Sequence, residues 1–218
     1  TARCEVATIH DRHDTLFGGK LPAPSAATLH SLQNYVVEKQ CDIGIATDGD
    51  ADRIGVIDDK GNFLHPNDIL VLLYYYLMRY RGWRGAAVRN LATTHLLDRI
   101  AEDFGETCYE VPVGFKYVSA KMVETGAIIG GESSGGLTVR GHIQGKDGIY
   151  AAALLVEAIA KTGRRLSALW DEITQKYGAA EMAEHDFHFS SAERTRIFKL
   201  LMEDKHLPEF PCEIAKVS

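Results

Sequence analysis

Three aspartates stand at alternating positions in one short polar stretch, and their types and spacing are suited to chemistry. Asp48, Asp50 and Asp52 are separated only by Gly49 and Ala51, so no bulky side chain keeps their carboxylates from converging. Three carboxylates held together repel one another strongly. A hard divalent cation removes that repulsion, and Mg²⁺ bound by a few carboxylates keeps positions free for phosphate. The spacing therefore predicts a magnesium site.

Arg53 directly follows the three aspartates. A guanidinium matches phosphate oxygens bidentately, so an arginine beside a carboxylate-bound cation predicts a phosphate contact. Two simpler interpretations compete with this one. A D-x-D turn is more often a solvated hairpin, although the third aspartate and the arginine count against that. An EF-hand loop needs Gly at its sixth position and Glu at its twelfth, where this chain has Arg53 and Asp59.

Two further motifs follow downstream. G-F-K-Y at 114–117 places Lys116 in the first turn of a predicted helix, where the helix dipole favours an anionic neighbour. G-G-E-S-S-G-G at 130–136 sets Glu132 and Ser134 between glycines. Glycines let a backbone approach a ligand closely, and a carboxylate accepts hydrogen bonds from sugar hydroxyls. Taken alone, each motif also has a simpler interpretation. The lysine of the first motif could be a solvated surface residue, and the second motif could be an ordinary glycine-rich turn.

The acidic stretch needs elements that position it. Apolar residues alternate with smaller ones before and after it, at Ile43, Ile45, Ile54 and Val56. This alternation predicts a strand, a loop and a second strand. Upstream, the pattern predicts a strand near 5–9 and a helix over 25–39 with Ser25 as its N-cap.

From residue 85 onward, short predicted strands alternate with helices. The strands are expected near 87–91, 107–111 and 127–129, and the helices over 94–104 and 116–124. This order is typical of a three-layer α/β/α domain, in which ligands bind at the carboxyl ends of the strands. The glycine-rich motif and the lysine motif both fall at such ends.

Longer helices surround this region. Asn67 is predicted to cap a helix over 68–81, whose tyrosines at 74–76 are expected to pack on a sheet. Asp147 is predicted to cap a helix over 149–161. Later elements are a helix over 167–177, a strand over 187–189, and a helix that begins with a capping box of Ser190 and Glu193.

The composition narrows the class of protein. With 24 basic and 30 acidic residues the net charge is -6, without a block of like charges, which argues against nucleic-acid and membrane-surface partners. The longest apolar run, at 69–77, is too short to span a bilayer, and no leader sequence is predicted. The four cysteines show no C-x-x-C spacing, so we expect reduced thiols and a cytoplasmic protein.

The motifs A-T-D-G-D-A-D-R-I-G, G-F-K-Y, G-G-E-S-S-G-G and K-D-G-I occur in this order. Together they resemble the phosphohexomutases, the phosphoglucomutase and phosphomannomutase superfamily. The resemblance implies an isomerase that uses Mg²⁺ and a phosphoserine to interconvert hexose 1-phosphate and hexose 6-phosphate through a bisphosphorylated intermediate. At the matching positions it implies Mg²⁺ ligation by Asp48, Asp50 and Asp52, phosphate contact by Arg53, an active-site role for Lys116, sugar-hydroxyl binding by Glu132 and Ser134, and a basic active-site residue at Arg89.

The resemblance covers only part of the family pattern. The nucleophile segment T-x-S-H-N-P and the phosphate-binding loop R-x-S-G-T do not occur in the 218 residues. We therefore expect α/β architecture with three-layer α/β/α domains and mixed sheets, one domain partial and one complete. The expected division is a partial second mutase domain with the metal loop at 1–65, a third mutase domain with the sugar loop at 66–186, and a strand, helix and tail toward a missing domain at 187–218.

On this basis the chain is expected to be a fragment that does not turn over by itself. Two other functions stay open. One is a non-catalytic module that binds Mg²⁺ or a sugar phosphate. The other, less favoured, is a haloacid-dehalogenase-like phosphatase, whose later lysine and acidic pair are not located in the chain. The choice between glucose, mannose and glucosamine phosphate and the oligomeric state are also open.

Overall fold

The structure is a computed structural model that describes residues 4–180, 187–207, 209 and 211. It divides into two compact units, Thr1–Ala180 and Glu181–Ser218. The helices and strands of the first unit are α1 (His30–Lys39), β1 (Gly44–Thr47), β2 (Ile54–Ile57), β3 (Phe63–Leu64), α2 (Pro66–Arg79), β4 (Ala87–Asn90), α3 (Leu96–Asp103), β5 (Cys108–Val111), α4 (Phe115–Thr125), β6 (Ile129–Gly131), β7 (Leu137–Val139), α5 (Gly148–Thr162) and α6 (Leu166–Tyr177), with a short 3-10 turn at Phe17–Gly19.

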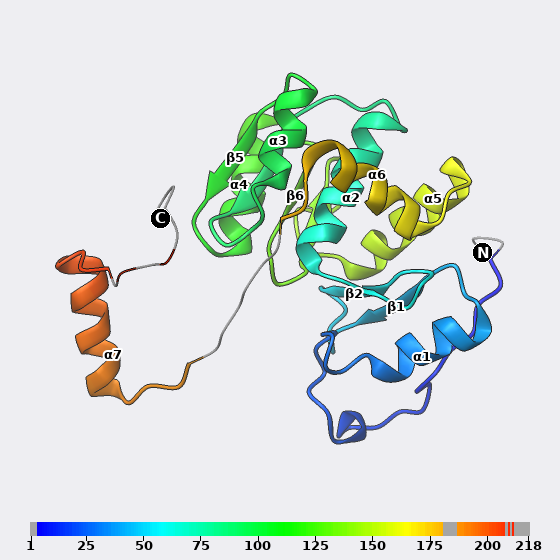
Figure 1. The fold of residues 1–218 in the computed structure, drawn as a ribbon, viewed down its shortest axis with the longest axis horizontal. Coiled ribbons are helices and arrows are strands. Elements are labelled where there is room, and N and C mark those ends of the chain that lie inside the picture. Colours follow the sequence, from blue (N-terminus) through cyan, green and yellow to red (C-terminus); the bar gives the residue numbers. More distant parts are fainter. Residues whose placement is uncertain (1–3, 181–186, 208, 210, 212–218) are drawn as a thin grey trace. The chain divides into compact units, whose positions relative to one another are not determined.

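The first sheet has the order β1-β2-β3, and both of its pairings are antiparallel. The hairpin of β1 and β2 carries the acidic stretch, so the predicted strand, loop and strand are confirmed. Helix α1 lies along one face of this hairpin and α5 lies along the other (Figure 1). Gly44 permits the close approach of α1, since a Cβ there would lie 2.7 Å from Cγ2 of Val36.

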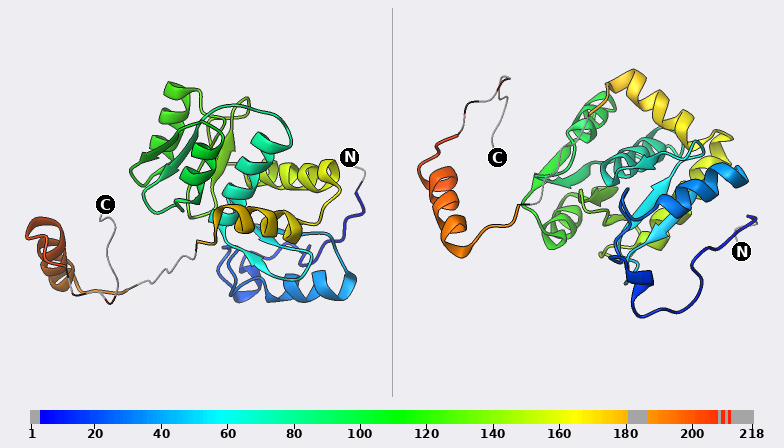
Figure 2. Two further views of the ribbon diagram at one scale, coloured as in Figure 1. Left: turned by 45° about the horizontal axis from the view of Figure 1, so that its top comes forward. Right: turned by 60° about the horizontal axis from the view of Figure 1, so that its bottom comes forward.

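The second sheet has the order β5-β4-β6-β7. Strand β4 pairs in parallel with β5 and β6, and β7 is antiparallel to β6. Val88 of β4 packs with Val118 and Met122 of α4 on one face, whereas Ala87 joins the core with α2 and α3 on the other. Figure 2 shows this layering from two further directions. The predicted three-layer α/β/α domain is confirmed with a mixed sheet, although the first sheet is purely antiparallel in the part that the structure describes.

Helix α2 is buried on all sides rather than along one stripe. Tyr74, Tyr75 and Tyr76 are each at most 3% exposed, which confirms that they pack in the core. Their hydroxyl groups reach acceptors, as buried tyrosines require. Tyr75 donates to Oε1 of Glu172 at 2.7 Å, and Tyr76 donates to Oε1 of Glu157 at 2.6 Å.

The start of α2 differs from the prediction. The N-cap is His65, not Asn67: Nδ1 of His65 accepts a hydrogen bond from the Asn67 N–H at 3.1 Å, and Oδ2 of Asp68 accepts one from the His65 N–H at 3.2 Å. Pro66 explains the earlier start, because its fixed φ and missing N–H suit the first helical position.

The capping carboxylate of Asp68 makes stability depend on pH. Burial raises the pKa of Asp68 from 3.8 to about 6, although the hydrogen bond from the His65 N–H opposes this. Between these pH values the folded chain holds a proton that the unfolded chain has lost, so wild-type stability falls as the pH rises through the window. The variant Asp68→Asn does not titrate. We expect its free energy of unfolding to gain roughly 2–3 kcal/mol relative to wild type between about pH 4 and about pH 7, measured by urea unfolding. A difference that stays constant with pH would contradict this.

Two other expectations near the N-terminus are wrong. The helix predicted from Ser25 begins at His30, because Thr28 Oγ1 accepts a hydrogen bond from the Ser25 N–H at 2.9 Å and donates to the Ala23 carbonyl at 2.6 Å. These bonds hold a turn that competes with the helix. The strand predicted near 5–9 is irregular, and Val6 is 79% exposed, since no neighbouring strand pairs with this segment in the described part.

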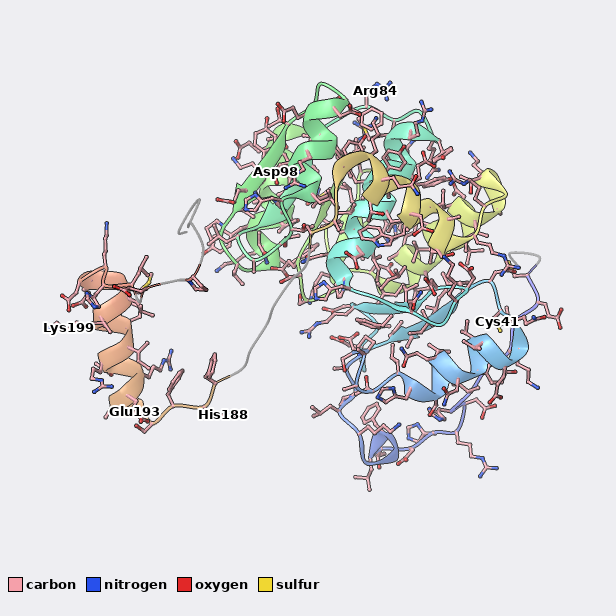
Figure 3. The ribbon with its side chains drawn as sticks, viewed as in Figure 1. Cys41, Arg84, Asp98, His188, Glu193 and Lys199 are labelled. Atoms are coloured by element: carbon pink, nitrogen blue, oxygen red, sulfur yellow. The ribbon has the colours of Figure 1, made fainter. Side chains whose placement is uncertain are left out.

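The second unit contains α7 (Ser191–Phe198), which continues as a π-helical turn at Lys199–Glu203. Glu193, labelled in Figure 3, forms the predicted capping box with Ser190. The predicted strand over 187–189 is wrong, because no strand pairs with these residues among those described; Phe187 and Phe189 instead stack with ring centroids 6.0 Å apart. The last residues of the two predicted domains, 181–186 and 212–218, lie outside the residues that the structure describes.

The expectations from composition concern thiols and membrane spans. Cys41 and Cys108 are free thiols, and burial raises the pKa of Cys108 to about 12, so that thiol is unreactive at neutral pH. None of the described helices has the length and apolar character needed to cross a membrane.

Candidate functional site

The acidic loop between β1 and β2 is closed by its own first aspartate. Thr47 and Ile54 form the last pair of the hairpin. Oδ1 of Asp48 accepts a hydrogen bond from the Arg53 N–H at 3.1 Å, and the Asp48 carbonyl accepts one from the Ala51 N–H at 3.2 Å. Ala51 has a φ of 59°, in the left-handed region that few non-glycine residues adopt. The loop is therefore a tight turn rather than an extended excursion.

The structure brings the three predicted metal ligands together. One carboxylate oxygen from each of Asp48, Asp50 and Asp52 lies within 4.8 Å of the other two. Oxygens coordinate Mg²⁺ at about 2.1 Å, which places adjacent ligands about 3 Å apart. The three oxygens are thus close enough for small side-chain movements to bring them around one Mg²⁺ ion.

Two basic residues balance the negative charge of this cluster. Nε of Arg53 lies 3.5 Å from Oδ2 of Asp48 and 3.5 Å from Oδ1 of Asp52. Lys146, from the segment before α5, forms an ion pair with Oδ2 of Asp52. Oδ1 of Asp52 is nevertheless buried without a hydrogen bond among the described residues, which is costly for a carboxylate. An all-oxygen cluster with a buried, unsatisfied oxygen fits Mg²⁺.

The glycine-rich loop lies directly against the acidic loop. Arg53 and Gly136 form an antiparallel β-bridge. Gly135 has a φ of 100°, and a Cβ there would lie 3.2 Å from the Ile54 carbonyl oxygen, so this position requires glycine. The Glu132 N–H donates to the Gly136 carbonyl at 3.0 Å and closes the loop. Two motifs far apart in the sequence are therefore neighbours in space.

Glu132 is the point where three segments of the chain meet. Glu132 is only 8% exposed. Oε1 accepts hydrogen bonds from Nδ2 of Asn90 at 3.1 Å and from the Gly114 N–H at 3.0 Å. Gly114 begins the G-F-K-Y motif and has a φ of 128°. Within the described part, no donor contacts Oε2 of Glu132, which leaves one oxygen able to accept a bond from a ligand.

Two family profiles match the chain along most of its length. The profile described as phosphoglucomutase/phosphomannomutase, alpha/beta/alpha domain II matches residues 1–61, and the profile of alpha/beta/alpha domain III matches residues 65–177. The chain belongs to the phosphoglucomutase/phosphomannomutase superfamily. It carries domains II and III of that superfamily, as the motifs had implied.

Individual relatives agree with the family profiles. A phosphoglucomutase/phosphomannomutase of Thermococcus kodakarensis is 33% identical over 174 residues, which cover 80% of this chain and 38% of the relative. A probable phosphoglucosamine mutase of Methanosarcina barkeri is 35% identical over 170 residues, covering 78% of this chain and 38% of the relative. The crystal structure of a putative phosphomannomutase from Thermus thermophilus aligns with a TM-score of 0.71 at 38% identity, over 75% of this chain and 37% of that one. The chain thus spans less than half the length of the relatives it matches.

Two predicted site residues, the catalytic Lys116 and the substrate-binding Ser134, are exposed near this site. Lys116 lies in the first turn of α4, and its Nζ is 4.9 Å from the ring centroid of Tyr117. Helix α4 begins beside the glycine-rich loop, because Gly114 donates to Glu132. Ser134 is exposed in that loop. Neither side chain contacts the acidic cluster in the described part, so both roles stay predictions.

Arg89 lies in β4 and is 2% exposed. Its Nε donates to Oδ2 of Asp98 at 2.7 Å, and Nη1 donates to Oε2 of Glu110 at 2.9 Å; Asp98, on α3, is labelled in Figure 3. Burial alone would lower the pKa of Arg89, but these carboxylates raise it above its usual value. The guanidinium is thus bound to two carboxylates of its own domain, and its predicted substrate contact stays a prediction.

Several polar residues at or beside the site were not assigned a role from the sequence. Lys146 and Asn90 are two of them. His142 is a third, and its Nε2 donates a hydrogen bond of 2.7 Å to Oδ2 of Asp147, because an ionised carboxylate can only accept. The predicted cap is confirmed, since Oδ1 of Asp147 accepts from the Tyr150 N–H at 2.8 Å. Burial opposes the effect, but these two bonds hold the pKa of Asp147 below its usual range. The K-D-G-I motif was the signal that could have indicated Lys146.

Proposed function

We propose that this chain supplies the metal-binding and sugar-binding parts of a phosphohexomutase that interconverts hexose 1-phosphate and hexose 6-phosphate through a phosphoserine and a bisphosphorylated intermediate. The observation that supports this most is the β-bridge between Arg53 and Gly136, which holds the acidic loop against the loop of Glu132. A cation site and a sugar-hydroxyl site side by side suit a substrate that carries both phosphate and hydroxyl groups. The similar proteins from Thermococcus and Methanosarcina are mutases of glucose, mannose and glucosamine phosphates by name.

In this proposal the residues divide the substrate between them. Asp48, Asp50 and Asp52 would hold Mg²⁺, which when bound stabilises the charge on a phosphoryl group during its transfer. Arg53 contacts phosphate oxygens with its guanidinium. Its side chain is 44% exposed, so a phosphate can reach it. The exposed ammonium group of Lys116, near the N-terminus of α4, adds positive charge for the same phosphate or for the second one.

Glu132 and Ser134 are proposed to bind the sugar itself. Oε2 of Glu132 offers an acceptor, and the exposed hydroxyl of Ser134 can donate or accept. Hydroxyl contacts have a particular value in this reaction. The bisphosphorylated intermediate must present first one end and then the other to the same serine, and hydroxyls between the two phosphates are available in both orientations.

The 218 residues contain no T-x-S-H-N-P segment, and we propose that they bind hexose phosphate without turning it over. We propose that this binding takes place in the cytoplasm, where thiols such as those of Cys41 and Cys108 remain reduced. With Mg²⁺ present, calorimetry is expected to show saturable binding of glucose 1-phosphate, mannose 1-phosphate or glucosamine 1-phosphate, and ³¹P NMR is expected to show no conversion.

Each failure of this experiment has a separate meaning. Absence of binding to all three sugar phosphates would contradict the proposed function. Conversion to a 6-phosphate by this chain alone would contradict only the claim that it cannot turn over. Release of phosphate from p-nitrophenyl phosphate, lost in Asp48→Asn, would favour the phosphatase alternative instead.

A further inference from the structure

Asn90 holds a fixed orientation at the carboxyl end of β4. The residue is 2% exposed. Its Oδ1 accepts hydrogen bonds from the Ala92 N–H at 3.0 Å and from Oγ1 of Thr93 at 2.8 Å. A backbone N–H can only donate, so the oxygen of the amide must face Ala92. The NH₂ group therefore has to face Glu132, whose Oε1 lies 3.1 Å away.

We propose that Asn90 is a positioning residue for Glu132, which it holds with Oε2 presented to a hydroxyl of the sugar. This inference rests on the proposed function. A free glutamate side chain rotates about three bonds, and fixing it lowers its freedom at a measurable entropic cost. Donors from two separate segments, Asn90 and the Gly114 N–H, both bind Oε1. These two donors fix the carboxylate during folding, so the binding of the sugar does not have to bear the entropic cost of fixing it.

Few other donors near Glu132 could replace the Asn90 amide in binding its carboxylate. Arg89 is adjacent in the chain, but its guanidinium binds Asp98 and Glu110. Among the described residues, the hydrogen bonds to the Glu132 carboxylate come from Asn90 and Gly114 alone. Loss of the Asn90 donor would leave one backbone N–H to orient a side chain that can still rotate around it.

The sharpest test is Asn90→Asp, which keeps the size of the side chain and both acceptor bonds but replaces the donor with a carboxylate facing Glu132. We expect the affinity for glucose 1-phosphate to fall about tenfold or more, measured by calorimetry with Mg²⁺ present. The affinity for inorganic phosphate should not change, because phosphate does not use Glu132. Asn62→Asp is the matched control, since Nδ2 of Asn62 donates to Oδ2 of Asp58 at 3.0 Å on the β2–β3 hairpin.

A double-mutant cycle separates positioning from a general loss of structure. If Asn90 acts through Glu132, then Asn90→Ala lowers glucose 1-phosphate affinity in the wild-type background and has no further effect in a Glu132→Ala background. Additive losses would show that Asn90 acts elsewhere and would overturn the proposal. Wild-type affinity in both Asn90→Asp and Asn90→Ala would overturn it as well.

The amide resonance of Gly114 gives a readout that needs no sugar. Because this N–H donates to Glu132, its chemical shift should move in Glu132→Ala and also in Asn90→Ala, where the carboxylate is no longer held. If the wild-type chain binds no hexose phosphate, the proposed function fails on that observation alone. The positioning of Glu132 is then decided by the NMR result, and an unchanged Gly114 resonance in both Asn90 variants overturns it.

Discussion

Asp50→Asn is expected to lower the affinity of the chain for Mg²⁺ by about a hundredfold or more while leaving the fold intact. Asp50 is exposed, and within the described structure its side chain makes no hydrogen bond or ion pair, so the substitution breaks no internal contact. It removes one full negative charge next to a divalent cation, where charges interact most strongly. Calorimetry measures the affinity, and thermal unfolding with and without Mg²⁺ measures the linked stability. Without Mg²⁺, the melting temperature should stay the same or rise, because one of three repelling carboxylates is gone.

Asp42→Asn is the matched control for this prediction. Asp42 is exposed and lies two residues before Gly44, the first residue of β1, at the opposite end of the strand that leads into the acidic loop. The substitution changes the net charge equally but removes no proposed ligand. Equal losses in the two variants would mean that long-range electrostatics governs the affinity. Full Mg²⁺ affinity in Asp50→Asn would mean that the acidic cluster does not hold the metal.

The acidic loop was predictable from the sequence because its features are local. The alternation of Ile43 and Ile45 identifies the strand, and the spacing of the aspartates brings them to one side of a short turn. The contact between this loop and the glycine-rich loop that carries Glu132 is of a different kind. It joins segments distant in the chain, and the motif resemblance implied it where periodicity alone could not.

Asn90 could not be found in the same way. An asparagine at the end of a strand is common in turns, and its role depends on Glu132 and Gly114, which reach it from two other segments. The only available signal was its place at the carboxyl end of a predicted parallel strand, where sites gather.

The two wrong strand predictions share a physical cause, and the wrong cap of α2 has another. Residues 5–9 and 187–189 alternate as strands do, but a strand is stable only when a neighbour binds its backbone, and no described neighbour does. For α2, Asn67 has the residue type that favours a cap, yet the histidine before Pro66 holds that position. Proline at the first helical position was the stronger signal.

The K-D-G-I motif shows how a single explanation can hide others. Asp147 caps α5 as predicted, but capping explains only one residue of the motif. Lys146 forms an ion pair with Asp52, and Gly136 has no room for a side chain because Lys146 passes over it. Gly148 contacts the acidic loop through its backbone, so the whole motif connects α5 to the metal site.

Gly148→Ala is therefore expected to disturb the metal site through the backbone. The Gly148 N–H donates to the Ala51 carbonyl at 3.0 Å, and a Cβ on Gly148 would lie 2.6 Å from the Arg53 oxygen and 3.0 Å from the Ala51 oxygen. Alanine normally favours a helix over glycine by up to about 1 kcal/mol. Overlap with backbone atoms, which cannot rotate away, outweighs this, and we expect a loss of about 2–3 kcal/mol in the free energy of unfolding. Mg²⁺ affinity should fall too, because Asp52 lies between the two displaced residues.

Gly145→Ala makes the same change three positions earlier and serves as the control. A Cβ there would meet its nearest neighbour, Cδ1 of Ile143, at 3.9 Å, which is ordinary contact, so stability and Mg²⁺ affinity should stay near wild type. Urea unfolding and calorimetry on both variants separate two causes. If Gly148→Ala loses stability but keeps Mg²⁺ affinity, α5 has moved instead of the loop, and the acidic cluster does not depend on this contact. If both variants match wild type, the start of α5 shifts to accommodate the added methyl group. The contact of Gly148 with the acidic loop then determines neither the stability nor the Mg²⁺ affinity.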